Sequence, residues 1–258
     1  FIVGLALAVI LLIQNNIIIG LLFTLIAIVA MHEYLGAITK VCKPVKWVAY
    51  LSCAIVAMPS FIITQQLTKT LIYLIPFVLL ILFAKVIATD MKTTFKDMAY
   101  TLLGICYIPT FIMFLNLIDG MKNGKFLLGY IFIASWGTDV FAYCIGRRFG
   151  KHKLSKVSPK KSIEGCIAGT IGSTVLALIY TIILNNVLTF EYSYFIVGIS
   201  GIALSLIGQL GDFSASCIKR YVDIKDYSNL LPGHGGMLDR IDSVLFIAPF
   251  AYMLFTII

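Results

Sequence analysis

Residues 166–188 have the sequence CIAGTIGSTVLALIYTIILNNVL, a run without any Asp, Glu, Lys or Arg. An α-helix needs about 20 apolar residues to cross the hydrocarbon core of a bilayer. Val and Ile are frequent in such runs, but an open sheet edge in lipid would leave backbone groups without hydrogen-bond partners. The run therefore predicts a transmembrane helix.

The composition of the whole chain agrees with this prediction. Of its 258 residues, 60% are hydrophobic and only 12% are charged, and the mean hydropathy is +0.99. Soluble domains carry about 45–50% apolar and about 25% charged residues. A soluble fold of this length leaves roughly a quarter of its surface wet and cannot hide so many apolar side chains. These figures exclude an ordinary soluble enzyme, a disulfide scaffold and a disordered chain, and they indicate an integral membrane protein.

We predict an all-α membrane protein, a polytopic bundle of about nine transmembrane helices. Its first 125 residues are expected to form a scaffold (residues 1–125), and the rest to carry the loops with the chemistry (residues 126–258). The chain begins with Phe1 rather than Met, so we expect further residues before it. The nine predicted spans are residues 1–13, 17–38, 45–63, 71–89, 99–118, 126–145, 166–188, 192–211 and 243–258.

Positive residues lie mostly on one side of the predicted membrane. The chain has 20 Lys and Arg against 12 Asp and Glu, a net charge of +8. They crowd into short stretches between apolar runs, which suits a membrane boundary better than a nucleic-acid-binding face. Sixteen of the 20 follow spans two, four, six and eight, so the positive-inside rule puts these loops and the N-terminus in the cytoplasm. Two of these cytoplasmic loops, 146–165 and 212–242, are long, and long loops are usually functional.

Carboxylates concentrate in the second long loop. Five of the 12 acidic residues fall within 31 positions, and they are Asp212, Asp223, Asp226, Asp239 and Asp242. Asp139 lies inside an apolar span. An Asp at the centre of a transmembrane helix costs about 2.5–3.5 kcal/mol. Such residues therefore line a wet cavity, pair with Lys or Arg, or bind cations. For Asp139 alone, a side chain that reaches the membrane interface is an equal alternative.

Three of these carboxylates predict a metal site. Asp239 and Asp242 are three residues apart, which places both on one face of a helix. With Asp212 at the end of another span, they form an oxygen-rich set suited to Mg²⁺, which takes one or two carboxylates and completes its shell with water and phosphate. The lack of neighbouring His or Cys in this set argues against zinc.

A glycine-rich segment directly precedes this pair. Residues 231–236 have the sequence LPGHGG, and Gly233, Gly235 and Gly236 would let the backbone N–H groups approach a phosphate. The same residues also mark simple turns. His234 is expected to donate to a phosphate, or else to be a solvated loop residue.

Cations and hydroxyls near these loops suggest a triphosphate site. The segment Ser158-Pro159-Lys160-Lys161-Ser162 could hold a triphosphate, and Lys219, Arg220 and Lys225 add positive charge near the predicted metal. A metal, lysines and a glycine loop without a Ser-His-Asp arrangement favour phosphoryl or nucleotidyl transfer, which depends mainly on positioning and charge stabilisation.

Glu33 is an acid within a predicted span. An intramembrane acid is a functional hypothesis by default. A structural role as partner of a loop lysine is equally expected, so Glu33 is not included among the catalytic residues.

Several of these segments together resemble one enzyme family. They are SCIKRYVDIKDYSNLLPGHGGMLDRID at 216–242, SPKKSIEG at 158–165, DVFAY at 139–143 and Gly146-Arg147. This pattern is similar to that of the phosphatidate cytidylyltransferases, the bacterial-type CDP-diacylglycerol synthases. The resemblance covers residues 136–242, and the first 125 residues match in hydropathy and length only.

The resemblance implies an activity and a set of site residues. It implies a homodimer in the bacterial cytoplasmic membrane that converts CTP and phosphatidic acid to CDP-diacylglycerol and pyrophosphate at its cytoplasmic side. It also implies Mg²⁺ on Asp212, Asp239 and Asp242, with a second cation such as K⁺. The implied catalytic residues are Asp139, Asp212, Lys219, Arg220, Lys225, Asp226, Asp239, Arg240 and Asp242. The implied nucleotide-binding residues are Ser158, Lys160, Lys161, Gly233, His234, Gly235 and Gly236.

Two other functions share some of these features. A CTP-dependent lipid kinase, such as a polyprenol kinase, would use the same membrane setting and metal. A secondary transporter would use membrane acids to relay protons or coordinate Na⁺, although transporters usually place them in broken helices of two similar halves. No duplicated half is visible in this sequence.

Overall fold

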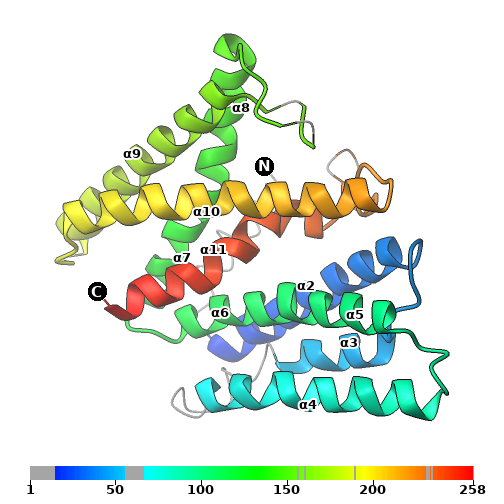
Figure 1. Cartoon of the computed structure of the whole chain (residues 1–258). Coiled ribbons are helices and arrows are strands. Elements are labelled where there is room, and N and C mark those ends of the chain that lie inside the picture. Colours follow the sequence, from blue (N-terminus) through cyan, green and yellow to red (C-terminus); the bar gives the residue numbers. More distant parts are fainter. Residues whose placement is uncertain are drawn as a thin grey trace. The chain divides into compact units, whose positions relative to one another are not determined.

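The computed structural model describes residues 15–55, 67–155, 157–159, 161–188, 190–230, 233 and 235–257. Within these ranges the regular structure is helical, apart from one isolated bridge between Lys153 and Ser162 (Figure 1). The predicted first span, 1–13, lies outside the described residues, as does the second half of the predicted span 45–63.

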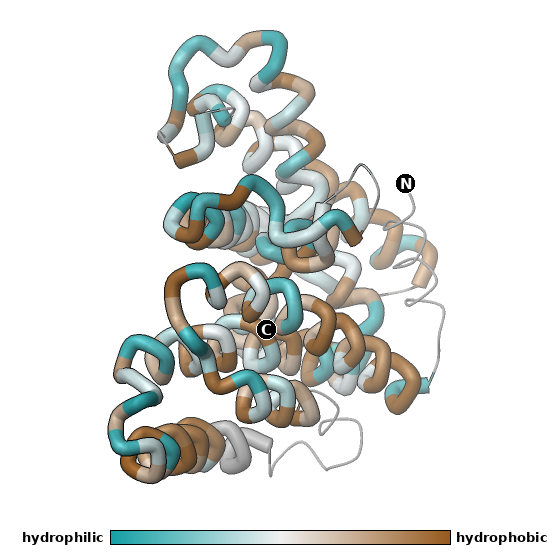
Figure 2. The backbone as a smooth tube through the Cα atoms, turned by 90° about the vertical axis from the view of Figure 1, so that its right-hand side faces the viewer, coloured by the Kyte–Doolittle hydropathy of each residue, from teal (hydrophilic) through white to brown (hydrophobic). Residues whose placement is uncertain are grey.

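The helices follow the apolar runs. They are α2 (Asn16–Ile38), α3 (Lys46–Cys53), α4 (Leu67–Ala88), α5 (Phe95–Tyr107), α6 (Pro109–Asp119), α7 (Gly124–Phe132), a π-helical turn (Ile133–Gly137), α8 (Thr138–Phe149), α9 (Ile163–Val187), α10 (Tyr194–Tyr221) and α11 (Leu238–Ile257). In Figure 2 much of the helical tube is brown and the connecting turns are largely teal, as expected for helices in an apolar environment.

Five helical stretches are long and apolar enough to cross a membrane. Among the described residues these stretches are α2, α5 with α6, α7 with α8, α9 and α10. This confirms an all-helical membrane protein, while the count of nine spans stays a prediction. The apolar part of α4 is shorter, and the first five residues of α11 include Asp239, Arg240 and Asp242.

The two long loops are shorter than predicted. α8 continues to Phe149 and α10 to Tyr221, while α9 begins at Ile163 and α11 at Leu238. The predicted loops 146–165 and 212–242 are therefore reduced to 150–162 and 222–237. Arg147 and Arg148 occupy the last turn of α8, and Lys219 and Arg220 that of α10. Cations near a helix C-terminus interact favourably with the helix dipole, so polar residues here extend the helices instead of ending them.

The chain forms two compact units. Unit 1 contains residues 1–124 and 221–240, and unit 2 contains residues 125–220 and 241–258. In unit 1, α2 packs against α3, α5 and α6. Tyr34 of α2 is fully buried, its hydroxyl donates to the carbonyl of Tyr100, and its ring fills the space beside Gly104.

Small residues bring α8 and α9 together in unit 2. A Cβ on Gly169 of α9 would lie 2.8 Å from the carbonyl oxygen of Thr138, and one on Gly165 would lie 2.8 Å from that of Ala142. Close backbone approach through small residues is a common mode of helix association in membranes. The pair α8–α9 is therefore fixed by the absence of side chains at these two glycines.

This packing yields a prediction with a matched control. Gly169→Ala should lower the melting temperature of the purified protein in detergent, because overpacking against a backbone carbonyl costs about 1–3 kcal/mol. A Cβ on Gly198 of α10 would meet no atom within 4 Å. Gly198→Ala should therefore be neutral or stabilising by up to about 1 kcal/mol through helix propensity. Equal melting temperatures for the two variants would contradict the glycine contact.

Candidate active site

An ion pair joins two of the predicted site residues in unit 2. The ammonium of Lys161, just before α9, contacts the carboxylate of Asp212 in α10. Both side chains are largely buried, at 24% and 21% exposed, and the Lys161 ammonium also lies 4.8 Å from the ring centroid of Phe213. The Lys161 ammonium, a predicted phosphate ligand, thus pairs with Asp212, a predicted metal ligand.

Asp242 is a buried carboxylate at the start of α11. It is 7% exposed, and its Oδ1 accepts the backbone N–H of Ser243 at 2.7 Å. Burial raises the pKa of Asp242 to about 7, Lys219 lowers the pKa through its positive charge, and Asp139 raises it. Lys161 also lowers this pKa. Together with the ion pair between Lys161 and Asp212, these charges connect five predicted site residues of unit 2. We call this set the Asp242 cluster, and its members are Asp139, Lys161, Asp212, Lys219 and Asp242.

Asp139 occupies the first turn of α8, where its side chain is exposed. The π-helical turn directly before it, Ile133–Gly137, is a type of irregularity that is frequent at functional sites. Thr138 is buried beside it and shares a 2.6 Å hydrogen bond with Ser205 of α10. The position of Asp139 is therefore set by a buried polar contact of its neighbour.

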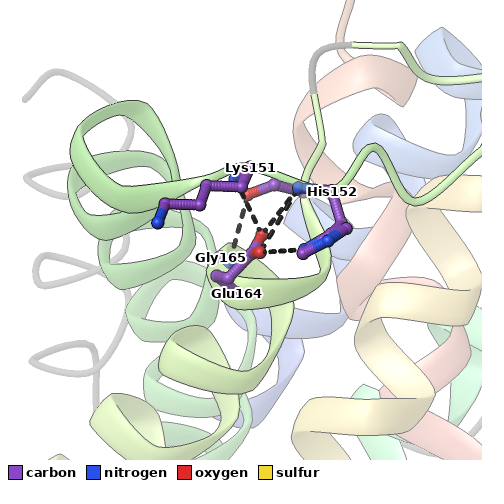
Figure 3. A network of polar contacts seen from close by, with 5 residues as sticks. Lys151, His152, Glu164 and Gly165 are labelled. Carbon is purple, nitrogen blue, oxygen red and sulfur yellow. Dashed lines mark hydrogen bonds and ion pairs between the residues drawn. The ribbon is translucent and has the colours of Figure 1, made fainter.

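The 150–162 loop is closed by Glu164 (Figure 3). Glu164, in the first turn of α9, accepts hydrogen bonds from the backbone N–H groups of Lys151 and His152, and its Oε1 lies 2.6 Å from Nδ1 of His152. Ser162 caps α9 by accepting the N–H of Gly165 at 3.1 Å. These contacts fix both ends of the loop that carries Ser158 and Lys161.

Two other predicted residues flank this loop. The carbonyl of Ser158 accepts the N–H of Lys161 at 3.1 Å, which forms the turn before α9. Nε of Arg220, at the end of α10, donates to the carbonyl of Val157 at 3.4 Å. Lys160, which stands between Ser158 and Lys161 in the sequence, lies outside the described residues.

The glycine-rich segment and Asp239, which follows it closely in the sequence, belong to unit 1. Oδ2 of Asp239 accepts the N–H of Gly236 at 3.0 Å and that of Tyr227 at 2.9 Å. Gly233 and Gly235 have φ angles of +74° and +78°, a left-handed conformation that favours glycine. Asp239 therefore closes the segment on itself, in addition to its predicted role towards a metal.

The remaining predicted residues of this segment are exposed or outside the described residues. Lys225, Asp226 and Arg240 are exposed, and Asp226 lies beside Gly235, whose Cβ position is 3.6 Å from its Oδ1. His234 lies outside the described residues, so its predicted contact with a phosphate stays a prediction.

Glu33 is the residue whose role the sequence did not resolve. It is 5% exposed and accepts hydrogen bonds from the hydroxyl of Ser228 at 2.5 Å and from the N–H groups of Met237 and Leu238 at 2.9 and 2.7 Å. The partner expected for a structural Glu33 was a loop lysine, whereas the observed partners are a hydroxyl before the glycine-rich segment and two backbone N–H groups directly after it. The sequence showed only that Glu33 is an acid within an apolar helix. This feature does not indicate a partner about 200 residues away.

The predicted metal ligands offer suitable chemistry without a preformed cage. Among the described residues, no group of three or more His, Cys, Asp and Glu side chains is placed to hold a metal ion. Asp212 and Asp242 belong to unit 2, and Asp239 belongs to unit 1. Mg²⁺ often takes one or two carboxylates and receives its other ligands from water and substrate phosphates. An oxygen-only set that includes a buried carboxylate fits this ion.

Comparison with known proteins decides the family. A model of the cytidylyltransferase family matches residues 1–258, the whole chain. The chain belongs to the cytidylyltransferase family. This confirms the resemblance seen in the sequence, and it covers the N-terminal residues that the motifs did not reach.

Curated relatives in this family are named phosphatidate cytidylyltransferase. The chain is 36% identical to the one from Bacillus subtilis over 180 residues, which are 69% of this chain and 65% of the relative. It is 38% identical to the one from Staphylococcus saprophyticus over 170 residues, 66% of this chain and 63% of the relative. It is 33% identical to the one from Thermotoga maritima over 181 residues, 69% of this chain and 66% of the relative. The match thus spans slightly less than two thirds of each relative.

Asp242 gives a prediction for the pH dependence of this family member. Its pKa in the folded state lies above the ordinary value of 3.8, so its contribution to stability is complete below about pH 4 and is lost as the pH rises through about 7. Without divalent cations, Asp242→Asn should therefore raise the melting temperature most at about pH 8 and least at about pH 4.

The control for this prediction is Asp223→Asn, which changes an exposed carboxylate of the 222–237 loop. Melting temperatures are measured in detergent with a chelator across this pH range. The same pH dependence for both variants would contradict the proposed burial of Asp242.

Proposed function

We propose that this protein is a phosphatidate cytidylyltransferase, which transfers CMP from CTP to phosphatidic acid and releases pyrophosphate. The observation that carries the proposal is the Asp242 cluster, in which two lysines and three carboxylates from four segments of unit 2 interact. Family membership and the names of the relatives support the choice of CTP and phosphatidic acid.

The proposed chemistry is an in-line displacement at the α-phosphorus of CTP. A phosphate oxygen of phosphatidic acid forms a new bond to this phosphorus, and the bond from the α-phosphorus to the bridging oxygen of the β-phosphate breaks. The electron pair of that bond leaves with pyrophosphate. A phosphomonoester has a second pKa of about 6, so the attacking oxygen is already ionised near neutral pH and needs no strong general base.

The cations of the chain are assigned to the charge of the triphosphate. Lys161 and Lys219 belong to the Asp242 cluster, and Arg220 contacts the loop that carries Lys161. Lys160 and Lys225 are proposed to add to them. Phosphoryl-group chemistry depends mainly on positioning and on such charge stabilisation.

The glycine-rich segment is assigned to the phosphates through its backbone. Gly233 and Gly235 have the left-handed φ angles that turn backbone N–H groups into a concave anion site. Asp226 lies beside Gly235 and Arg240 follows Asp239, so both are assigned to the same segment. Ser158 and His234 are proposed as further phosphate donors.

A magnesium ion is proposed to complete the site. Asp239 and Asp242, one turn apart on α11, would hold it together with Asp212, and Asp139 would support the site from α8. When bound, Mg²⁺ supplies Lewis-acid stabilisation and a template for the phosphates. A second cation such as K⁺ is proposed on the resemblance alone.

The membrane arrangement is also a proposal. Nine spans with the 150–162 and 222–237 loops in the cytoplasm follow from the positive-inside rule, and the five apolar helical stretches support this topology. A homodimer is proposed from the resemblance.

The activity is tested with purified protein, phosphatidic acid and labelled CTP. Label at the α-phosphate should enter the lipid, and label at the γ-phosphate should leave as pyrophosphate. Transfer of γ-label to a lipid such as a polyprenol would indicate a kinase instead. With Mg²⁺ present, absence of both pyrophosphate release and transfer of γ-label to a lipid would contradict both enzymes and favour a transporter. Removal of divalent cations by a chelator should stop the reaction, and added Mg²⁺ should restore it.

Asp239→Asn tests the proposed metal ligand in the same assay. Asp239→Asn should lower kcat by at least about 100-fold, because loss of a group that stabilises charge in the transition state typically lowers kcat by this factor. Glu191→Gln, which changes an exposed acid outside the site, should leave kcat unchanged. Normal turnover by Asp239→Asn would contradict the metal assignment.

A further inference from the structure

Glu33 connects α2 to the segment that directly precedes the proposed metal ligand Asp239. Its Oε1 accepts the Ser228 hydroxyl and the N–H of Met237, and its Oε2 accepts the N–H of Leu238. The three donors come from both ends of residues 228–238. A single side chain of α2 therefore ties the start and the end of this segment to one point.

The chemistry of these bonds makes Glu33 a strong anchor. Hydrogen bonds to an ionised carboxylate are about twice as strong as those between neutral groups. Met237 and Leu238 stand at the start of α11, where backbone N–H groups have no partner within the helix. A negative charge at a helix N-terminus is also favoured by the helix dipole. Glu33 thus acts as the N-terminal cap of α11, although it lies about 200 residues before it.

Gly236 shows how closely Glu33 approaches the segment. A Cβ on Gly236 would lie 2.7 Å from Oε2 and 2.8 Å from Oε1 of Glu33. Any side chain at this position would displace the carboxylate. Position 236 therefore requires glycine because the Glu33 carboxylate lies so close, and not because of the φ angle of the residue.

The same backbone positions the carboxylate of Asp239. The N–H of Gly236 donates to Oδ2 of Asp239, and the next two N–H groups along the chain donate to Glu33. Three consecutive N–H groups are thereby divided between the two acids. The orientation of Asp239 therefore depends on where Glu33 holds Met237 and Leu238.

We propose that Glu33 is a positioning residue of the cytidylyltransferase reaction, which fixes residues 228–238 and through them the carboxylate of Asp239. This inference rests on the proposed function. Among the described residues, α2 is the only element that supplies this anchor. The inference therefore gives the N-terminal part of the chain a positioning role in the active site.

The protein offers a closely matched control for this proposal. Asp97 of α5 is also in unit 1, is 4% exposed, and accepts two backbone N–H groups and one hydroxyl, from Lys43 and Thr94. It caps a helix N-terminus as Glu33 does, but it contacts a different segment. Asp97→Asn should therefore perturb local structure to the same degree without changing residues 228–238.

The experiment compares Glu33→Gln, Gly236→Ala and Asp97→Asn in the full-length protein in detergent. Glu33→Gln should lower kcat by about 10- to 100-fold, the range typical when a group that orients a metal ligand is removed. Gly236→Ala should lower kcat in the same way, because its methyl group displaces the Glu33 carboxylate. Asp97→Asn should keep kcat within about twofold of the parent.

Hydrogen exchange provides the second readout. The backbone amides of Met237 and Leu238 should exchange faster in Glu33→Gln than in the parent. Their exchange rates should be unchanged in Asp97→Asn. The amides in the helical core of unit 2 should keep their protection in both variants. This readout reports the anchor directly and does not depend on catalysis.

Ser228→Ala keeps the proposal testable if Glu33→Gln does not fold. It removes one of the three bonds and leaves the carboxylate with its two N–H donors, so kcat should fall in the same direction by a smaller factor. In a folded double variant with Glu33→Gln, the Ser228 change should lower kcat by less than it does in the parent, because the Gln amide keeps one acceptor oxygen for the three donors.

Three results would overturn the proposal. The first is a kcat for Glu33→Gln within about twofold of the parent. The second is an equal loss of kcat in Glu33→Gln and Asp97→Asn, which would mean general loss of structure. The third is a kcat that is unaffected by Ser228→Ala. If the parent makes CDP-diacylglycerol and Glu33→Gln is equally active, only this inference fails. If the parent makes none, the proposed function fails first.

Discussion

Backbone N–H groups at the ends of apolar helices must find acceptors, and in this protein carboxylates provide several of them. Glu33 accepts two such groups at the start of α11, and Asp97 accepts two at the start of α5 and before α3. Glu164 accepts two from the 150–162 loop. With only 12 acidic residues in the chain, three of them close turns in this way. The loops that carry the site residues depend on these bonds.

This use of acids divides the carboxylates into two groups. Glu33, Asp97 and Glu164 accept mainly backbone N–H groups, so hydrogen bonds disperse their negative charge. Asp212 and Asp242 instead interact with lysines, and burial raises the pKa of Asp242. A carboxylate that is buried and lacks a full set of donors is the better cation ligand, because a cation relieves the cost of burial. Asp239 shares the feature of the first group, because its Oδ2 accepts the backbone N–H groups of Tyr227 and Gly236.

Sequence alone could predict the fold class, because apolar runs such as 166–188 permit few structures besides a transmembrane helix. It also selected Asp212, Asp242, Lys161 and Lys219 as site residues, and the structure brings these together in unit 2. The loop ends were wrong, since polar residues at 146–149 and 212–221 continue their helices with dipole-favoured cations in the last turns. The partner of Glu33 was out of reach, because pairing across about 200 residues depends on tertiary packing and leaves no local pattern.

The bond between Glu33 and the 228–238 segment also has a consequence for biosynthesis. The bonded residues Glu33 and Ser228 are 195 positions apart. At a synthesis rate of about 5–20 residues per second, the donors emerge about 10–40 s after the acid itself. During this interval the Glu33 side chain must stay hydrated, since an unpaired buried carboxylate is costly. The final burial of Glu33 therefore waits until the C-terminal residues have been made.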